Sequence, residues 1–267
     1  MYGRGQTPGM GFGPPVTPTI VKQLLIANAV VFFLQALLAR YKVAVGPIAL
    51  PMTDFYGGAT PHLFWEQGYL WQPFTYMWLH GGLGHLAMNC FVLWMFGSQL
   101  ALAWGTRRFL RFYLICGIGA GFIILSLPYL AFALGMGGAG SLYIPTVGAS
   151  GAIYGVLLAY SLTWPDRTIM LIFPPVAFRA IWLIPALFGM AFVMDSGGRI
   201  SHIGHLGGVL VGWLYMRRTG TAGKILSMNQ LKYRWRRYRM RQKLRAVRHE
   251  EHQSRRRRPD SDDQTLH

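Results

Sequence analysis

Six stretches of the chain are long and mostly apolar, and polar residues gather between them. They cover residues 20–39, 83–104, 109–130, 147–164, 176–194 and 202–216. A helix that crosses a bilayer needs about 20 predominantly apolar residues. The pattern therefore predicts an all-α membrane protein whose six transmembrane helices form one bundle.

The composition agrees with this fold class, because 52% of the residues are hydrophobic and only 13% are charged. The chain divides into a Gly/Pro-rich segment, 1–19, a helical body, 20–216, and a basic tail, 217–267. The first segment lacks an apolar run that ends in a small-residue cleavage site, so we expect no signal peptide. No internal repeat is evident, which disfavours a transporter built from inverted halves.

Lys and Arg between the predicted helices indicate the orientation, since short cytoplasmic loops carry an excess of these residues. The relevant cations follow the second, fourth and sixth predicted helices: Arg107, Arg108, Arg111, Arg167, Arg179, Arg217 and Arg218. They fall on one side if both termini are cytoplasmic. We therefore expect a multi-pass protein, placed in a bacterial inner membrane, with both termini in the cytoplasm.

The net charge of +17 is concentrated in the tail, where 16 of the 26 Lys and Arg residues lie between Arg217 and Arg258. Aromatic residues are interleaved with them at Tyr233, Trp235 and Tyr238. Each cation near an anionic membrane surface contributes about 1 kcal/mol, so we expect the tail to lie on anionic lipid headgroups. The spacing leaves nucleic-acid binding open, but the sixth helix already holds the tail at the membrane, which favours lipid.

Polar side chains inside the apolar stretches are the candidates for chemistry, because each strongly polar group there costs roughly 2.5 to 3.5 kcal/mol. His85 and Asn89 are four residues apart and share one face of the second helix. Ser150 opens the fourth helix and His205 opens the sixth. A single polar residue in a membrane helix usually bonds a neighbouring helix, which is the alternative interpretation of each.

The glycines around Ser150 distinguish it from a structural serine. Gly148 and Gly151 remove side chains next to the hydroxyl and allow backbone or substrate to approach. Small residues also line facing sides of the fourth and sixth helices, at Gly151 with Gly155 and at Gly208 with Gly212. Two smooth faces would bring Ser150 within hydrogen-bond reach of His205.

A serine hydroxyl needs a base to act as a nucleophile, and histidine suits that role. No acid lies well inside the apolar stretches, so the residues indicate a Ser150/His205 dyad instead of a triad. Tyr154, one turn after Ser150, is placed to hold the imidazole by packing, and His85 and Asn89 become donors to an oxyanion. The two cysteines, Cys90 and Cys116, are interpreted as small hydrophobes, and no metal or cofactor is predicted.

These residues resemble the rhomboid family of intramembrane serine proteases over about residues 20–216. The motifs are His80 with His85-x-x-x-Asn89, Gly148-x-Ser150-Gly151 with Tyr154, and His205-x-x-Gly208-x-x-x-Gly212. The resemblance implies a six-helix core with a water-filled cavity, Ser150 as nucleophile and His205 as general base. It also implies an oxyanion hole formed by His85, Asn89 and the Ser150 amide, and a gate for the substrate helix formed by the fifth helix and loop 195–201.

Two positions depart from the family pattern: Gln72 follows Trp71 where Arg is frequent, and Ala101 stands four residues before Gly105 where Glu is frequent. His202 lies three residues before His205 on a similar face. We assign the general base to His205, because the motif glycines Gly208 and Gly212 are spaced from that residue. The predicted function is an endopeptidase that cleaves transmembrane segments of membrane-protein substrates. The alternative is a catalytically silent rhomboid-like protein that binds membrane helices.

Overall fold

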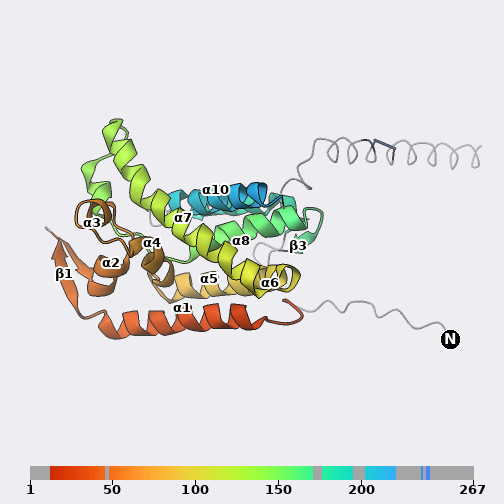
Figure 1. Ribbon diagram of the computed structural model, residues 1–267, viewed down its shortest axis with the longest axis horizontal. Coiled ribbons are helices and arrows are strands. Elements are labelled where there is room, and N and C mark those ends of the chain that lie inside the picture. The colour runs from red at the N-terminus through yellow and green to blue at the C-terminus, as the bar shows by residue number, and fades with distance from the viewer. Residues whose placement is uncertain are drawn as a thin grey trace, which may run out of the picture. The chain divides into compact units, whose positions relative to one another are not determined.

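The computed structural model describes residues 13–45, 48–170, 176–194, 202–220, 236 and 239–240. The chain divides into two compact units, residues 1–219 and 220–267. Most of the basic tail and residues 1–12 lie outside the described residues, as does loop 195–201. All of the predicted site residues lie in the first unit, whose helices and strands are labelled in Figure 1.

Three helical stretches are long and apolar enough to cross a membrane. They are α1 (Thr19–Leu38), the run from Leu83 to Trp104, and α7 (Thr106–Ala133). The second run consists of α5 (Leu83–Val92), a π-helical turn η2 (Leu93–Gly97) and α6 (Ser98–Trp104). Gly105, with φ of 81°, separates α6 from α7 in a conformation that favours glycine.

The remaining apolar helices are shorter: α8 (Ser150–Thr163), α9 (Leu183–Met194) and α10 (His202–Arg218). The six predicted segments thus occur as helices, whereas the structure identifies only three of them as long enough to span a membrane among the described residues. The fourth helix is shorter than the predicted 147–164, because Gly148 has φ of 135° and the helix begins only at Ser150.

The predicted helix over 176–194 is wrong in its first part. Residues Ala177–Arg179 form β4, which pairs antiparallel with β3 (Thr168–Met170), and the 3-10 turn η4 (Ala180–Trp182) precedes α9. Strand pairing satisfies the backbone groups there in place of helical hydrogen bonds. The apolar pattern cannot distinguish these two solutions over so few residues.

The connection between α1 and α5 contains short elements. They are the antiparallel strands β1 (Lys42–Val45) and β2 (Ile48–Pro51), helices α2 (Met52–Gly57), α3 (Pro61–Trp65) and α4 (Gln72–Thr75), and the 3-10 turn η1 (Tyr76–Trp78). A further 3-10 turn, η3 (Ala139–Tyr143), lies between α7 and α8. These strands are small additions to a helical bundle.

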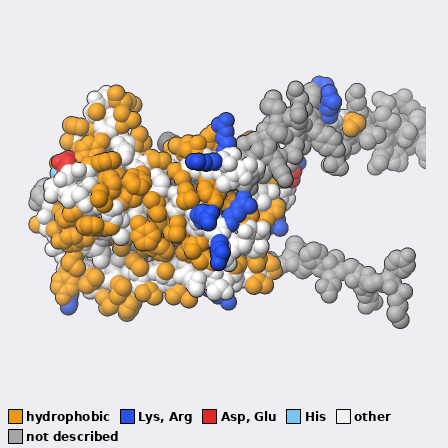
Figure 2. Space-filling model, in the orientation of Figure 1, with side chains coloured by type: hydrophobic (Ala, Val, Ile, Leu, Met, Phe, Trp, Pro, Cys, Tyr) orange, Lys and Arg blue, Asp and Glu red, His pale blue; other side chains and the backbone are white. Residues whose placement is uncertain are grey.

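Helix α8 forms the centre of this unit, packed against α7 and α10 and also against η2 and α5 (Figure 1). Every residue of α8 is buried except Ser150, Leu158 and Thr163, which are half-buried. Hydrophobic side chains cover most of the visible outer face of the unit (Figure 2). A buried central helix with a polar residue at its end, surrounded by helices with apolar outer faces, is the arrangement expected of a membrane protein.

Candidate active site

Ser150 is the first residue of α8 and is half-buried. The turn before it depends on Gly148, whose φ of 135° is strained for any side chain. The Gly148 N–H donates to the Tyr76 carbonyl oxygen at 2.9 Å. The backbone of η1 therefore holds the turn that places Ser150 at the start of α8.

His85 and Ser150 both face the space left by the missing side chain of Gly148. A Cβ placed on Gly148 would lie 2.9 Å from His85 Nε2 and 3.7 Å from Ser150 Oγ. The Gly81 N–H donates to His85 Nδ1 at 3.3 Å, so a neutral ring carries its proton on Nε2. A histidine N–H is thus available beside the serine hydroxyl.

Asn89 lies one turn further along α5 and is buried. Its Nδ2 group has no hydrogen-bond partner among the described residues. A buried donor without an acceptor costs about 1 to 3 kcal/mol, and such a group in a native protein calls for an explanation. An acceptor that arrives with a substrate is one explanation.

The imidazole of His205 stacks on the phenol ring of Tyr154. Their centroids lie 4.0 Å apart and the planes differ by 14°. Phe188 of α9 adds a tilted contact with Tyr154 and an edge contact with His205, at centroid distances of 5.1 Å and 6.4 Å. His205 is buried and its Nδ1 has no hydrogen-bond partner within the described part of the chain. Ring packing therefore orients this histidine without a carboxylate.

Glycines bring α8 and α10 into backbone contact. A Cβ on Gly208 would lie 1.8 Å from the Gly151 carbonyl oxygen, and one on Gly212 would lie 3.2 Å from Gly155 Cα. No side chain fits at Gly208 without moving a helix. This glycine contact, the seam between α8 and α10, holds the first residues of α8 next to the first residues of α10.

Five of the predicted site residues form two groups, which lie at successive turns near the start of α8. His85, Gly148 and Ser150 surround one space, while Tyr154 and His205 stack beside it on α8 and α10. Among the described residues no hydrogen bond joins the Ser150 hydroxyl to His205. Catalytic hydrogen bonds are often long in proteins without substrate and tighten in the complex.

Gln35 of α1 supports the site, a role that the sequence pattern did not predict. Its Oε1 accepts from the His80 N–H at 2.9 Å, and its Nε2 donates to Asp54 Oδ1 at 3.3 Å. Burial raises the pKa of the Asp54 carboxyl, and hydrogen bonds from Thr53 and Gln35 oppose the rise. Gln35 therefore fixes the segment that enters the helix carrying His85. A polar residue inside an apolar run was the signal that could have revealed it.

One of the two positions that depart from the family pattern, Gln72, also has a structural role. Gln72 is fully buried, and its Oε1 accepts from the Thr60 N–H at 3.0 Å. Next to it, Ala59 and Thr146 exchange two backbone hydrogen bonds of 2.9 Å. A neutral amide thus braces the first connection at Thr60, and the adjacent backbone pair of Ala59 and Thr146 joins this connection to the segment that precedes Ser150.

Comparison with known proteins identifies one family. A family model described as the rhomboid domain matches residues 67–220. The chain is 33% identical over 138 residues to Rhomboid protein 1, mitochondrial, of Saccharomyces cerevisiae, which covers 51% of this chain and 38% of the relative. It is 33% identical over 144 residues to the human Presenilin-associated rhomboid-like protein, mitochondrial, covering 51% of this chain and 35% of the relative.

A bacterial relative is also similar. Rhomboid protease GluP of Bacillus subtilis is 30% identical over 175 residues, which cover 63% of this chain and 31% of the relative. The match thus spans less than half the length of each of these relatives. Because several of the relatives are mitochondrial proteins, the comparisons do not support the expected bacterial inner membrane.

Proposed function

Since the chain belongs to the rhomboid family, we propose that it is an intramembrane serine endopeptidase that cleaves transmembrane segments of membrane proteins. The observation that carries the proposal is the shared space over Gly148, where Ser150 Oγ and the Nε2–H side of His85 meet. A nucleophile and an anion-stabilising donor have to surround the same reacting carbonyl.

In the proposed reaction Ser150 Oγ attacks the carbonyl carbon of the scissile peptide, and His205 takes the hydroxyl proton. The C–N bond then breaks, His205 returns the proton to the leaving amine, and an acyl ester remains on Ser150. Water, activated by the same imidazole, hydrolyses the ester and frees the serine. The stack on Tyr154 supports this role, because it holds the ring in one orientation through both proton transfers.

The developing oxyanion accepts hydrogen bonds from His85, Asn89 and the Ser150 amide. His85 carries its proton on the nitrogen that faces the site, and Asn89 has a buried donor without a partner. Donors held in place before the reaction cost no reorganisation, and one such donor contributes about 3 to 4 kcal/mol in other enzymes. The amide of Ser150 is free for this purpose because it belongs to the first turn of α8.

The proposed membrane arrangement has six crossing helices with both termini on the side of the Arg-rich connections. At about 1.5 Å per residue, α8 is only ~21 Å long, against a hydrocarbon core of about 30 Å. A short central helix leaves Ser150 below the membrane surface, where a water-filled cavity opening outward supplies the hydrolytic water.

The proposed route for the substrate helix runs past α9. Among the described side chains of α9 only Leu183 is buried, and Phe188 is the contact with Tyr154 and His205. Displacing α9 would break few buried contacts among its described side chains and expose the histidine to a substrate. By resemblance to the family, loop 195–201 belongs to the same proposed gate.

A fluorophosphonate probe tests the nucleophile. The wild type should be labelled, with the adduct mapped to Ser150, and Ser150→Ala should not be labelled. Ser161→Ala is the matched control, since this hydroxyl lies on the same helix and donates to the Leu158 carbonyl oxygen at 2.8 Å. Absence of labelling in folded wild type would instead support the silent helix-binding protein.

A further inference from the structure

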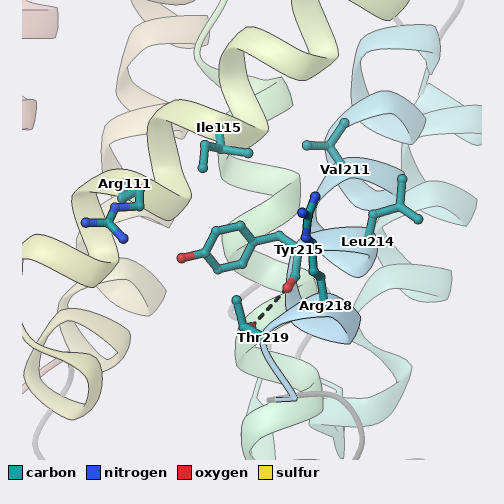
Figure 3. Close-up of a pocket in the computed structure, with 7 residues that line it drawn as sticks. All are labelled: Arg111, Ile115, Val211, Leu214, Tyr215, Arg218 and Thr219. Carbon is teal, nitrogen blue, oxygen red and sulfur yellow. Dashed lines mark hydrogen bonds between the residues drawn. The ribbon is translucent and has the colours of Figure 1, made fainter.

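A cavity of about 620 Å³ lies between α7 and α10, at the opposite end of these helices from the serine site. The cavity is lined by Arg111 and Ile115 of α7 and by Val211, Leu214, Tyr215, Arg218 and Thr219 at the end of α10 (Figure 3). Tyr215 reaches from α10 across the gap toward α7. The cavity combines two cations with an apolar wall.

Packing of the two helices explains why the cavity forms. Near the site they touch closely, because a Cβ on Gly207 would lie 3.2 Å from Ala120 Cα and one on Gly119 would lie 2.8 Å from Val211 Cγ2. Beyond Gly212, α10 has no further glycine, and α7 has none before Gly117. Tyr215 instead packs its ring against a phenylalanine of α7, Phe112, with centroids 5.2 Å apart. The helices are thus held apart where the cavity opens.

The two arginines of the cavity are available to a ligand. Both Arg111 and Arg218 are exposed, and neither has a carboxylate within ion-pair distance in the described ranges. Other cations at this end have aromatic partners: Arg108 lies 4.7 Å from the Trp104 ring and Arg217 lies 5.1 Å from the Trp213 ring. Lys and Arg gather at this end of the unit, among hydrophobic side chains (Figure 2).

A cation at the end of a membrane helix usually extends to the headgroup layer without forming a site. This pair differs because its members come from different helices and flank one cavity. Ile115, Val211 and Leu214 continue the cavity wall toward the middle of the helices, where lipid chains lie. Two guanidinium groups above an apolar wall match a phosphate joined to an acyl chain.

We propose that this cavity is a binding site for an anionic phospholipid. The phosphate lies between Arg111 and Arg218, and one acyl chain follows the wall formed by Ile115, Val211 and Leu214. The volume is within the range of about 300 to 1,000 Å³ that is usual for ligand sites. A lipid bound there joins α7 to α10 and so stabilises the helix that carries His205.

Native mass spectrometry of the delipidated full-length protein in detergent tests the site. Phosphatidylglycerol is compared with phosphatidylcholine of the same acyl chains. The wild type should retain one phosphatidylglycerol molecule most tightly, and the double variant R111A/R218A should reduce its occupancy by at least about tenfold. Arg107→Ala is the matched control, because Arg107 is an exposed cation at the same end of α7 but does not line the cavity. The tail is unchanged in every variant, so any lipid that it binds is a constant background.

Two further measurements distinguish binding of the acyl chain from binding of the phosphate alone. Leu214→Trp fills the space along the apolar wall and leaves both arginines in place, so it should weaken the retention of phosphatidylglycerol. In the wild type, inorganic phosphate should not displace phosphatidylglycerol. Equal losses in Arg107→Ala and the double variant would overturn the site, as would unchanged retention in the double variant. Competition by inorganic phosphate, or unchanged retention in Leu214→Trp, would overturn the lipid as its occupant. Melting of each variant without lipid confirms that it is folded.

Discussion

The seam between α8 and α10 makes Gly208→Ala a severe test of how the site is held together. The substitution adds one methyl group to α10, and that carbon would lie 1.8 Å from the carbonyl oxygen of Gly151 and 2.7 Å from its carbonyl carbon. Optimal contacts between heavy atoms lie near 3.5 Å. The obstacle is helix backbone, so the helices have to separate by about 1.5 Å or shift along one another.

The expected cost has a structural and a catalytic part. Overpacking a close contact destabilises a protein by about 1 to 3 kcal/mol, partly offset here by roughly 1 kcal/mol from replacing glycine by alanine in a helix. Displacing reacting groups by about 1 Å costs about 100-fold in rate. Since Gly208 lies one turn after His205, the larger effect falls on the turnover number.

Cleavage of a helix reporter in detergent and thermal melting are the two assays. Gly208→Ala should lower the turnover number by about 100-fold and lower the melting midpoint by a few degrees. Gly84→Ala is the control, because it is also a helical glycine but a Cβ there meets nothing within 4 Å. Its melting midpoint should be unchanged or higher. If Gly208→Ala melted like the control and kept turnover within about threefold of wild type, the account of the seam would be wrong.

Three other substitutions address the support and the donors of the site. Asn89→Ala should lower the turnover number by about 100-fold with little change in KM and no fall in melting temperature, because its Nδ2 bonds nothing in the described structure; equal loss of melting and activity would contradict a role confined to the reaction. Gln35→Ala should lower the free energy of unfolding by about 1 to 3 kcal/mol, because the buried His80 N–H loses its acceptor, and an unchanged melting curve would refute this. Asp54 has a pKa raised by burial above the usual value of about 3.9, so the folded state loses stability as the pH rises through the raised pKa. Asp54→Asn should therefore stabilise the protein at pH 7 and have little effect near pH 4, and a gain that was larger at low pH would reverse the argument.

The sequence predicted the helical segments well because a helix that lies in a membrane is apolar over most of its length. It also predicted the close approach of α8 and α10 through the glycines after Ser150 and His205, whereas the hydrogen bond between Ser150 and His205 stays a prediction. The boundaries failed where local pairing competes with helix formation, as at Ala177–Arg179, which form a strand. Helix α10 has nearly its predicted length, whereas α8 begins later than predicted. The number of membrane crossings does not follow from these helix lengths alone.

The support of the site was harder to predict. Gln35 and Gln72 act through long-range hydrogen bonds to His80 and Thr60, and no periodicity links these pairs in the sequence. Tyr76 is one of many aromatic residues in its segment, yet its hydroxyl donates to the Gly117 carbonyl oxygen at 2.7 Å and its own carbonyl holds Gly148. Such contacts depend on tertiary packing, which the helical pattern does not specify.

The most direct test of the central claim is cleavage of a transmembrane-helix reporter by purified protein, with product termini identified by mass spectrometry. The wild type should cut within or beside the reporter helix, and Ser150→Ala and His205→Ala should each lower turnover about 1,000-fold or more while keeping the melting curve. Ser161→Ala, on the same helix as Ser150, should cleave at the wild-type rate. Turnover by Ser150→Ala within about tenfold of wild type, a barrier change of only ~1.4 kcal/mol, would contradict the assignment of Ser150 as the nucleophile.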